Sequence, residues 1–181
     1  MNARAKAIDM MPGPRLYWIE HPFGGRLAVT ARPTGGLELD NAVAGWRAAN
    51  LDVVVSMLEA EEAEDLGLGL QERLCGKQGI IFLNCPVPDH GLPEDRAAFL
   101  AVADQVLEHV RAGRRAAAHC FAGIGRSPLL VATVLVRHGL DPDIAWARVS
   151  QARGIVVPDT DAQWQWLADV ADGNEGACHS I

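Results

Sequence analysis

The sequence predicts a single α/β domain with a central, mostly parallel sheet flanked by helices. Short apolar runs rich in β-branched or small residues, at 53–58, 80–83 and 116–119, alternate with longer segments of helical pattern. This alternation is typical of a parallel sheet that helices cover on both faces. The length of 181 residues suits one such domain, because domains commonly have about 100–200 residues.

Five strands are expected, and each has its own signal. The first two are short and flank the turn-forming residues 21–25. The next two are continuous apolar runs, as in strands buried on both faces. The last consists of small residues, which suits close packing. The expected strands are residues 16–19, 27–29, 53–58, 80–83 and 116–119.

The helical segments are recognised by composition and by their end signals. Pro93 and two acidic residues suit a helix N-terminus, and Arg111 with Gly113 marks the end of that helix. Residues 128–136 are apolar all round, as expected of a buried helix. The acidic run 59–65 is expected to form a solvated helix face. The expected helices are residues 38–49, 59–65, 66–77, 93–111, 128–136 and two segments that begin near 141 and 158.

The ends of the chain and its charge limit the possible partners. Residues 1–14 and 172–181 are expected to be loose ends around a domain at 15–171. The formal net charge of −7, without a basic stripe, argues against binding to nucleic acid or to anionic membranes. No segment resembles a signal peptide or approaches the roughly 20 apolar residues of a membrane span. A cytoplasmic location is therefore expected.

The cysteines argue against a disulfide framework. The four cysteines, at 75, 85, 120 and 178, show no paired spacing. In a reducing compartment, a distinctive cysteine is more often catalytic than structural. Cys85 ends a strand that is expected to neighbour the strand before Cys120, so oxidative pairing of these two thiols is a further hypothesis.

One loop has a pattern suited to binding an anion. Residues 119–127 read His-Cys-Phe-Ala-Gly-Ile-Gly-Arg-Ser and lead from a strand into the expected buried helix. Gly123 and Gly125 allow backbone N–H groups to converge, and the helix directs its positive dipole end to the same point. Arg126 adds a planar fork for two phosphate oxygens. Cys120 would lie at the floor of this cradle, where positive surroundings favour a nucleophilic thiolate.

Other anion-binding and metal-binding patterns do not fit this loop. A Walker A loop needs Lys before Ser, but this position holds Arg126. A dinucleotide-binding fingerprint needs a third glycine, which the residues after Gly125 lack. The adjacent His119 and Cys120 are unsuited to share one zinc ion. We therefore expect neither a metal ion nor a cofactor.

Two loops resemble those of a known enzyme family. Residues 119–127 match the Cys-x5-Arg-Ser/Thr signature of the protein tyrosine phosphatase superfamily and are similar to the HCxAGxGRS form of its tyrosine and dual-specificity members. Independently, residues 87–93 resemble the mobile acid loop of tyrosine phosphatases, with Val87 where tryptophan is usual. The resemblance covers roughly residues 53–167. The size of the chain is similar to that of the compact dual-specificity-like branch.

This resemblance implies a role for each matched residue. Cys120 would attack phosphorus and form a phosphocysteine intermediate, while Arg126 would hold the phosphate oxygens. Asp89 would protonate the leaving oxygen and then act as a base toward water. The loop residues whose N–H groups would bind phosphate are Phe121, Ala122, Gly123, Ile124 and Gly125.

Three further positions correspond to supporting residues of the family. Ser127 corresponds to the hydroxyl that eases departure of the thiolate in the second step. His119 corresponds to the residue that supports the loop and tunes the cysteine. Gln163 resembles the glutamine that positions water in some members.

Three functions remain open from the sequence. The favoured one is a protein phosphatase of tyrosine or dual specificity, with phosphotyrosine preferred and a phosphate-like anion bound in the Cys120 loop. The second is a phosphatase for lipid or small-molecule phosphates, although Phe121, Ala122 and Ile124 lack the positive charge that suits inositol phosphates. The third is a catalytically silent phospho-binding module, which would need neither a nucleophile nor an acid.

Overall fold

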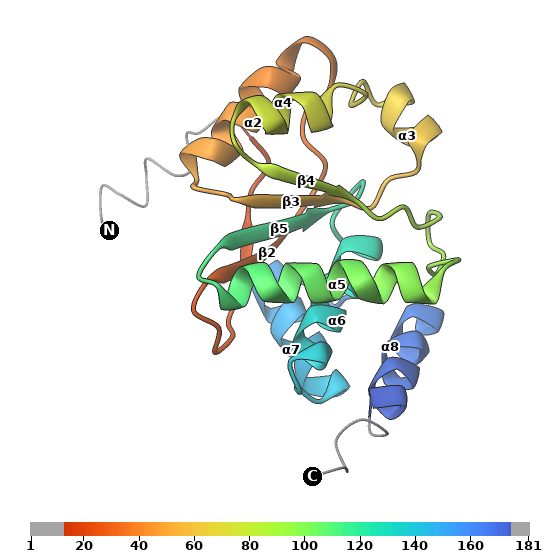
Figure 1. The fold of residues 1–181 in the computed structure, drawn as a ribbon. Helices are drawn as coiled ribbons and strands as arrows, with labels where there is room; N and C mark the ends of the chain where they lie inside the picture. Colours follow the sequence, from red (N-terminus) through yellow and green to blue (C-terminus); the bar gives the residue numbers. More distant parts are fainter. Residues whose placement is uncertain (1–12, 175–181) are drawn as a thin grey trace.

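Five strands within residues 13–174, the part of the chain that this computed structural model describes, form one sheet (Figure 1). Their spatial order is β1-β2-β5-β3-β4. β1 runs antiparallel to β2 at one edge, and all other neighbours are parallel. The prediction of a mostly parallel sheet is therefore confirmed. The strands are β1 (Tyr17–Ile19), β2 (Arg26–Thr30), β3 (Val53–Ser56), β4 (Ile81–Asn84) and β5 (Arg115–His119).

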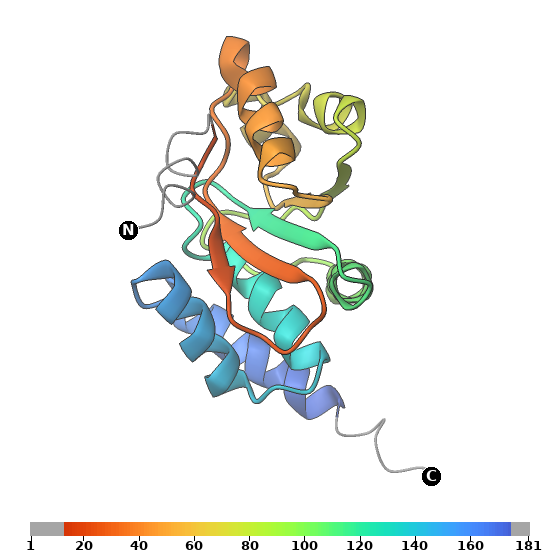
Figure 2. The ribbon, with the colours of Figure 1, turned by 90° about the vertical axis from the view of Figure 1, so that its left-hand side faces the viewer.

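Helices cover both faces of this sheet. Figures 1 and 2 show α2, α3 and α4 on one face and α5 to α8 on the other. The helical elements are η1 (Gly36–Glu38), α2 (Leu39–Ala48), α3 (Ala60–Asp65), α4 (Gln71–Lys77), α5 (Arg96–Arg111), α6 (Arg126–Arg137), α7 (Pro142–Arg153) and α8 (Asp161–Asn174). No helix of residues 13–174 has both the length and the apolar character needed to cross a membrane.

Helix α6 lies at the centre of the core. Every residue of α6 except Arg137 is buried, and α5, α7 and α8 pack around the helix. Burial of each large aliphatic side chain contributes about 1.5–3 kcal/mol relative to exposure. The small side chains of Ala116–Ala118 in β5 are also buried. The loop between β5 and α6 therefore connects two of the most firmly held elements of the fold.

Several helix boundaries differ from the expected ones. Helix α5 begins at Arg96 because the Asp95 carboxylate accepts a hydrogen bond from Ala98 N, at 2.9 Å; Pro93 lies before the helix. Residues 59–77 form two helices as expected, but the second begins at Gln71 instead of Leu66, and Gly67 adopts a φ of 68° between them. Helix α8 extends to Asn174, so the first residues of the expected C-terminal tail are helical. Residues 1–12 and 175–181, which hold most of the expected loose ends, lie outside the described part.

Candidate active site

The loop from Cys120 to Gly125, here called the phosphate loop, leaves the central strand β5 and enters α6. Its course depends on glycine at two points. Gly123 has a φ of 71°, and an added Cβ would lie 2.7 Å from the carbonyl oxygen of Thr30. A Cβ at Gly125 would lie within contact distance of the Asp159 carboxylate. Only glycine fits this tight path without displacing its neighbours.

The Cys120 side chain lies at the base of this loop. It is 3% exposed, and its Sγ accepts hydrogen bonds from Gly123 N and from Ser127 Oγ, both at 3.3 Å. Two donors directed at one sulfur stabilise a negative charge on it. The structure thus brings together Cys120, Ser127 and the phosphate loop as the sequence predicted.

Arg126 is a buried cation held by carboxylates. Its side chain is 2% exposed and makes a two-pronged ion pair with Glu62, with Nη1–Oε2 at 2.7 Å and Nη2–Oε1 at 2.9 Å. Nη1 also donates to the carbonyl oxygen of Val87, at 3.2 Å. The hydrogen bond from Arg126 lowers the pKa of Glu62 below its usual value. Both groups are therefore charged near neutral pH.

The sequence interpretation missed Glu62. This residue belongs to the acidic run 59–65, which we expected to be only a solvated helix face. That expectation is wrong for Glu62, because α3 follows β3, the strand beside β5, and so brings the run to the edge where the phosphate loop lies. The sequence did hold one signal for Glu62: an arginine that is buried needs a charged partner nearby.

Asp89 lies on the loop after β4 and reaches the same guanidinium. Its Oδ1 is 3.0 Å from Arg126 Nη2, while its side chain remains 63% exposed. His90, with a φ of 55°, contacts Asp159 through Nδ1 at 3.0 Å and lies 3.7 Å from Asp89 Oδ2 through Nε2. An exposed carboxyl group beside the anion cradle is suitably placed to exchange protons with a bound ester.

Gln163 lies behind the acid loop and is fully buried. Its Nε2 donates to the carbonyl oxygen of Gly91, at 3.0 Å, and its Oε1 is buried without a hydrogen-bond partner. The structure therefore brings Gln163 next to the loop that carries Asp89.

His119 lies beneath the phosphate loop. It is fully buried, its Nε2 lies 2.8 Å from Gln71 Nε2, and its Nδ1 lies 3.4 Å from the carbonyl oxygen of Cys120. Burial lowers the pKa of His119 to about 4. The ring is therefore neutral near neutral pH, and it contacts the backbone rather than the sulfur.

Cys85 does not lie next to Cys120. Cys85 follows β4, and β3 separates β4 from β5, so the expectation of neighbouring strands is wrong. Two strand spacings correspond to about 9–10 Å, whereas a disulfide needs Cα atoms within about 7 Å. Burial also raises the pKa of Cys85 to about 11, which keeps this thiol protonated. Oxidative pairing with Cys120 is not supported by this arrangement.

Comparison with known proteins identifies the family. A family model described as a polymorphic toxin system DSP-PTPase phosphatase matches residues 32–140. The chain belongs to this family. The phosphatase is also 29% identical over 143 residues to the tyrosine-protein phosphatase vhp-1 of Caenorhabditis elegans. That match covers 76% of this chain but 22% of the relative, so the chain spans a small part of that protein's length.

Solved structures share the fold of this phosphatase. Kinase associated phosphatase, with its catalytic cysteine replaced by serine, superposes with a TM-score of 0.80 at 17% identity, over 93% of this chain and 98% of that one. Tk-PTP superposes with a TM-score of 0.70 at 27% identity, over 93% of this chain and 100% of that one. The predicted superfamily, its dual-specificity-like branch and the fold are confirmed. The roles of individual site residues stay predictions.

Proposed function

We propose that this phosphatase hydrolyses phosphate monoesters through a phosphocysteine intermediate on Cys120. The observation that carries this proposal is the environment of the sulfur, which accepts two hydrogen bonds at the floor of a loop that ends on the buried Arg126. Converging N–H groups and a guanidinium stabilise the charge on the equatorial oxygens of the transferring phosphoryl group. The arrangement needs no metal ion to neutralise that charge.

In the first step, Cys120 Sγ forms a bond to phosphorus while the bond from phosphorus to the ester oxygen breaks. Asp89 donates its proton to that oxygen, which leaves as an alcohol or a phenol. The oxygens of the phosphoryl group accept hydrogen bonds from the loop N–H groups and from Arg126. The ion pair with Glu62 supports this step, because it holds the guanidinium in one orientation.

In the second step, water attacks phosphorus and transfers a proton to Asp89 as the sulfur–phosphorus bond breaks. Ser127 Oγ, at 3.3 Å from Sγ, stabilises the departing thiolate. The position of Gln163 against the loop that carries Asp89 supports a role in orienting this water. Inorganic phosphate and the free thiolate are the products, so the enzyme returns to its starting state.

The favoured substrate is a phosphorylated protein side chain, with phosphotyrosine preferred. A cavity of about 670 Å³ beside the phosphate loop is lined in part by Glu59, Glu61, Asp65, Asp89 and Phe121. Among the described residues, its lining includes no lysine or arginine. This negative surface repels polyanions such as inositol polyphosphates and favours neutral or basic neighbours of the phosphorylated residue. The half-exposed ring of Phe121 offers a contact for an aromatic leaving group.

A phosphatase for lipid or small-molecule phosphates is the alternative, because the same loop binds any phosphate monoester. A catalytically silent phospho-binding module has less support, since it requires neither a sulfur with two hydrogen-bond donors nor an exposed acid beside it.

Trapping the intermediate tests the reaction. Rapid acid quenching during turnover of a phosphotyrosine peptide should leave one phosphoryl group on the tryptic peptide that contains Cys120, as detected by mass spectrometry. Matched phosphotyrosine, phosphoserine and inositol phosphate substrates then rank the substrate classes. Turnover without a phosphorylated Cys120 peptide would overturn the mechanism, and preference for the inositol phosphate would select the alternative substrate class.

A further inference from the structure

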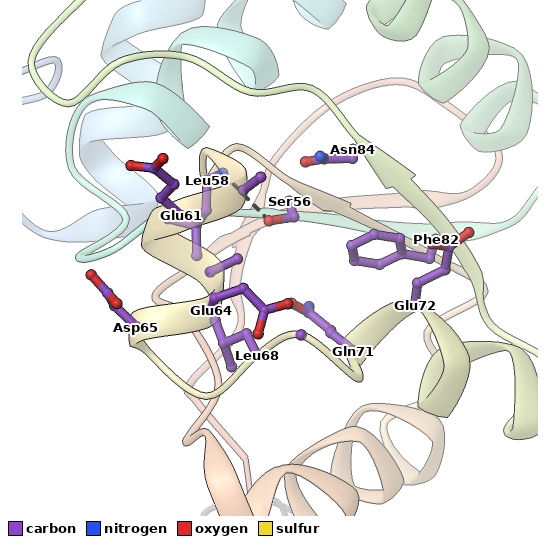
Figure 3. Close-up of a pocket in the computed structure, with 13 residues that line it drawn as sticks. Ser56, Leu58, Glu61, Glu64, Asp65, Leu68, Gln71, Glu72, Phe82 and Asn84 are labelled. Atoms are coloured by element: carbon purple, nitrogen blue, oxygen red, sulfur yellow. Dashed lines mark hydrogen bonds between the residues drawn. The ribbon is translucent and has the colours of Figure 1, made fainter.

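A buried amide lies behind His119 and is not explained by the chemistry described above. Gln71 is the first residue of α4, yet its side chain is only 3% exposed. It is one of the residues that line a cavity of about 500 Å³ between α3, α4 and the end of β3 and β4 (Figure 3). Its Nε2 lies 2.8 Å from Nε2 of His119. Gln71 therefore connects this second cavity with the residue before Cys120.

The contact fixes the tautomer of the imidazole. An amide nitrogen can only donate a hydrogen bond, so Nε2 of His119 must accept it and carries no proton. The proton of the neutral ring then lies on Nδ1, which is 3.4 Å from the carbonyl oxygen of Cys120 and donates to it. The two ring nitrogens thus have opposite roles, set by one glutamine.

Other groups around His119 do not supply this constraint. The Trp46 ring from α2 packs against the imidazole, with ring centroids 5.8 Å apart, but its indole N–H makes no hydrogen bond to His119 or to any other described residue. Arg126 and Glu62 act on His119 only through their opposite charges. Within residues 13–174, the hydrogen bonds of the His119 ring go to Gln71 and to the Cys120 carbonyl oxygen, not to Arg126 or Glu62. Burial disfavours the imidazolium, so the neutral ring depends on its hydrogen-bond partners for orientation.

We propose that Gln71 is a positioning residue of this phosphatase, which holds His119 in the Nδ1-protonated tautomer and thereby orients the first peptide group of the phosphate loop. This inference rests on the proposed function. It adds a residue from α4 to the machinery around Cys120, and that residue touches neither the substrate nor the sulfur. Its loss should lower kcat more than it raises KM, because Arg126 and the other N–H groups of the phosphate loop stay in place.

Histidine ¹⁵N NMR tests the tautomer without any substrate. In the wild-type protein near pH 7, His119 should carry its proton on Nδ1 and none on Nε2. The Gln71→Glu variant keeps the shape of the side chain but replaces the donor with an acceptor, so it should bring a proton onto Nε2. Its kcat for an aryl phosphate should fall about tenfold, with KM changed less than about twofold.

The matched control is Gln105→Glu on the exposed face of α5, which makes the same change of charge and should keep the wild-type spectrum and rate. Gln71→Met, which introduces no charge, should lower kcat about fivefold. A wild-type His119 protonated on Nε2 would overturn the inference, as would a folded Gln71→Met variant with the wild-type kcat. If wild-type protein does not hydrolyse phosphate esters, the proposed function fails, while the NMR spectrum still decides the tautomer.

Discussion

At the scale of single residues, the active site is organised around one buried cation. Arg126 is 2% exposed and contacts two carboxylates, Glu62 within the protein and Asp89 at the surface. A buried guanidinium is tolerated only when such partners compensate its charge. The two carboxylates have different environments, since Glu62 holds the fork in place and Asp89 stays accessible to an ester. Neutralising Glu62 and neutralising Asp89 should therefore change turnover in different ways.

Replacing Glu62 by glutamine should reduce turnover through loss of orientation. Gln accepts only one strong hydrogen bond from the fork and leaves the exposed Asp89 to compensate the buried charge, so kcat for an aryl phosphate should fall by about tenfold or more. Steady-state kinetics measure this, and Glu108→Gln on the exposed surface of α5 is the control. Wild-type kcat in a folded Glu62→Gln variant would show that the ion pair does not position Arg126.

Replacing Asp89 by asparagine removes the proposed proton donor and keeps the size of the side chain. The rate on a phosphoserine peptide, whose alkoxide is a poor leaving group, should fall by about 100-fold or more. An aryl phosphate with an acidic phenol should be affected less, because its leaving group needs less protonation. Comparison of the two substrates, with Asp172→Asn as the surface control, checks this. Equal losses on both substrates would contradict a role as general acid.

The residues of the site differed in how well the sequence revealed them. Cys120 to Ser127 could be recognised because a contiguous segment carries the whole signature. Glu62 and Gln71 could not, because their contacts depend on where α3 and α4 lie above the sheet. Neither residue type nor spacing specifies that placement.

At the scale of elements, the phosphate loop is shaped by backbone contacts on both sides. Gly123 passes beside the end of β2, and Arg153 of α7 donates to the carbonyl oxygen of Gly123 through Nε, at 2.7 Å. The acid loop has further contacts of its own, His90 with Asp159 and Gln163 with Gly91, besides those of Arg126 with Val87 and Asp89. A change at Arg153 or at Gln163 should therefore affect the two loops unequally.

Gly123→Ala should abolish the geometry of the phosphate loop. The new Cβ would meet the Thr30 carbonyl oxygen at 2.7 Å in a residue with a φ of 71°, and the resulting shift should lower kcat by about 100-fold. The control is Gly139→Ala, where φ is 104° but no atom lies within 4 Å of the new Cβ. That variant should lose only about 1 kcal/mol of stability and retain activity. Equal kcat values for the two variants would contradict the account.

Several elements were predictable because their patterns are local. The buried strands and α6 have continuous apolar runs, and the sheet and helices formed where those runs lie. The start of α5 was displaced because the Asp95 side chain competes with Pro93 as the N-terminal signal. The predicted position of Cys85 beside the strand of Cys120 was wrong, because β3 lies between the two strands that we expected to be neighbours. The spatial order of strands depends on long-range packing, which local patterns do not specify.

At the scale of the whole molecule, burial of His119 couples folding to pH. The pKa of His119 falls from 6.5 to about 4 on burial, so between these values the unfolded chain binds more protons than the folded one. Stability should therefore rise with pH through this window and decrease on acidification. Between these two pKa values, His119 changes the free energy of unfolding by about 1.4 kcal/mol per pH unit.

Urea unfolding of wild type and His119→Gln between pH 4.5 and pH 7 measures that contribution. The variant should show a flatter dependence of the free energy of unfolding on pH, although its absolute stability is lower. Identical slopes for both proteins would show that His119 is not held neutral in the folded state.

Hydrolysis of an aryl phosphate in the presence of a chelator, by wild type and by Cys120→Ser, tests the cysteine mechanism directly. The wild-type protein should turn over without a metal ion and the variant should show no turnover, since a serine hydroxyl in place of the thiolate is a poor nucleophile. Comparable turnover by Cys120→Ser, or a rate that requires a divalent metal ion, would contradict that mechanism.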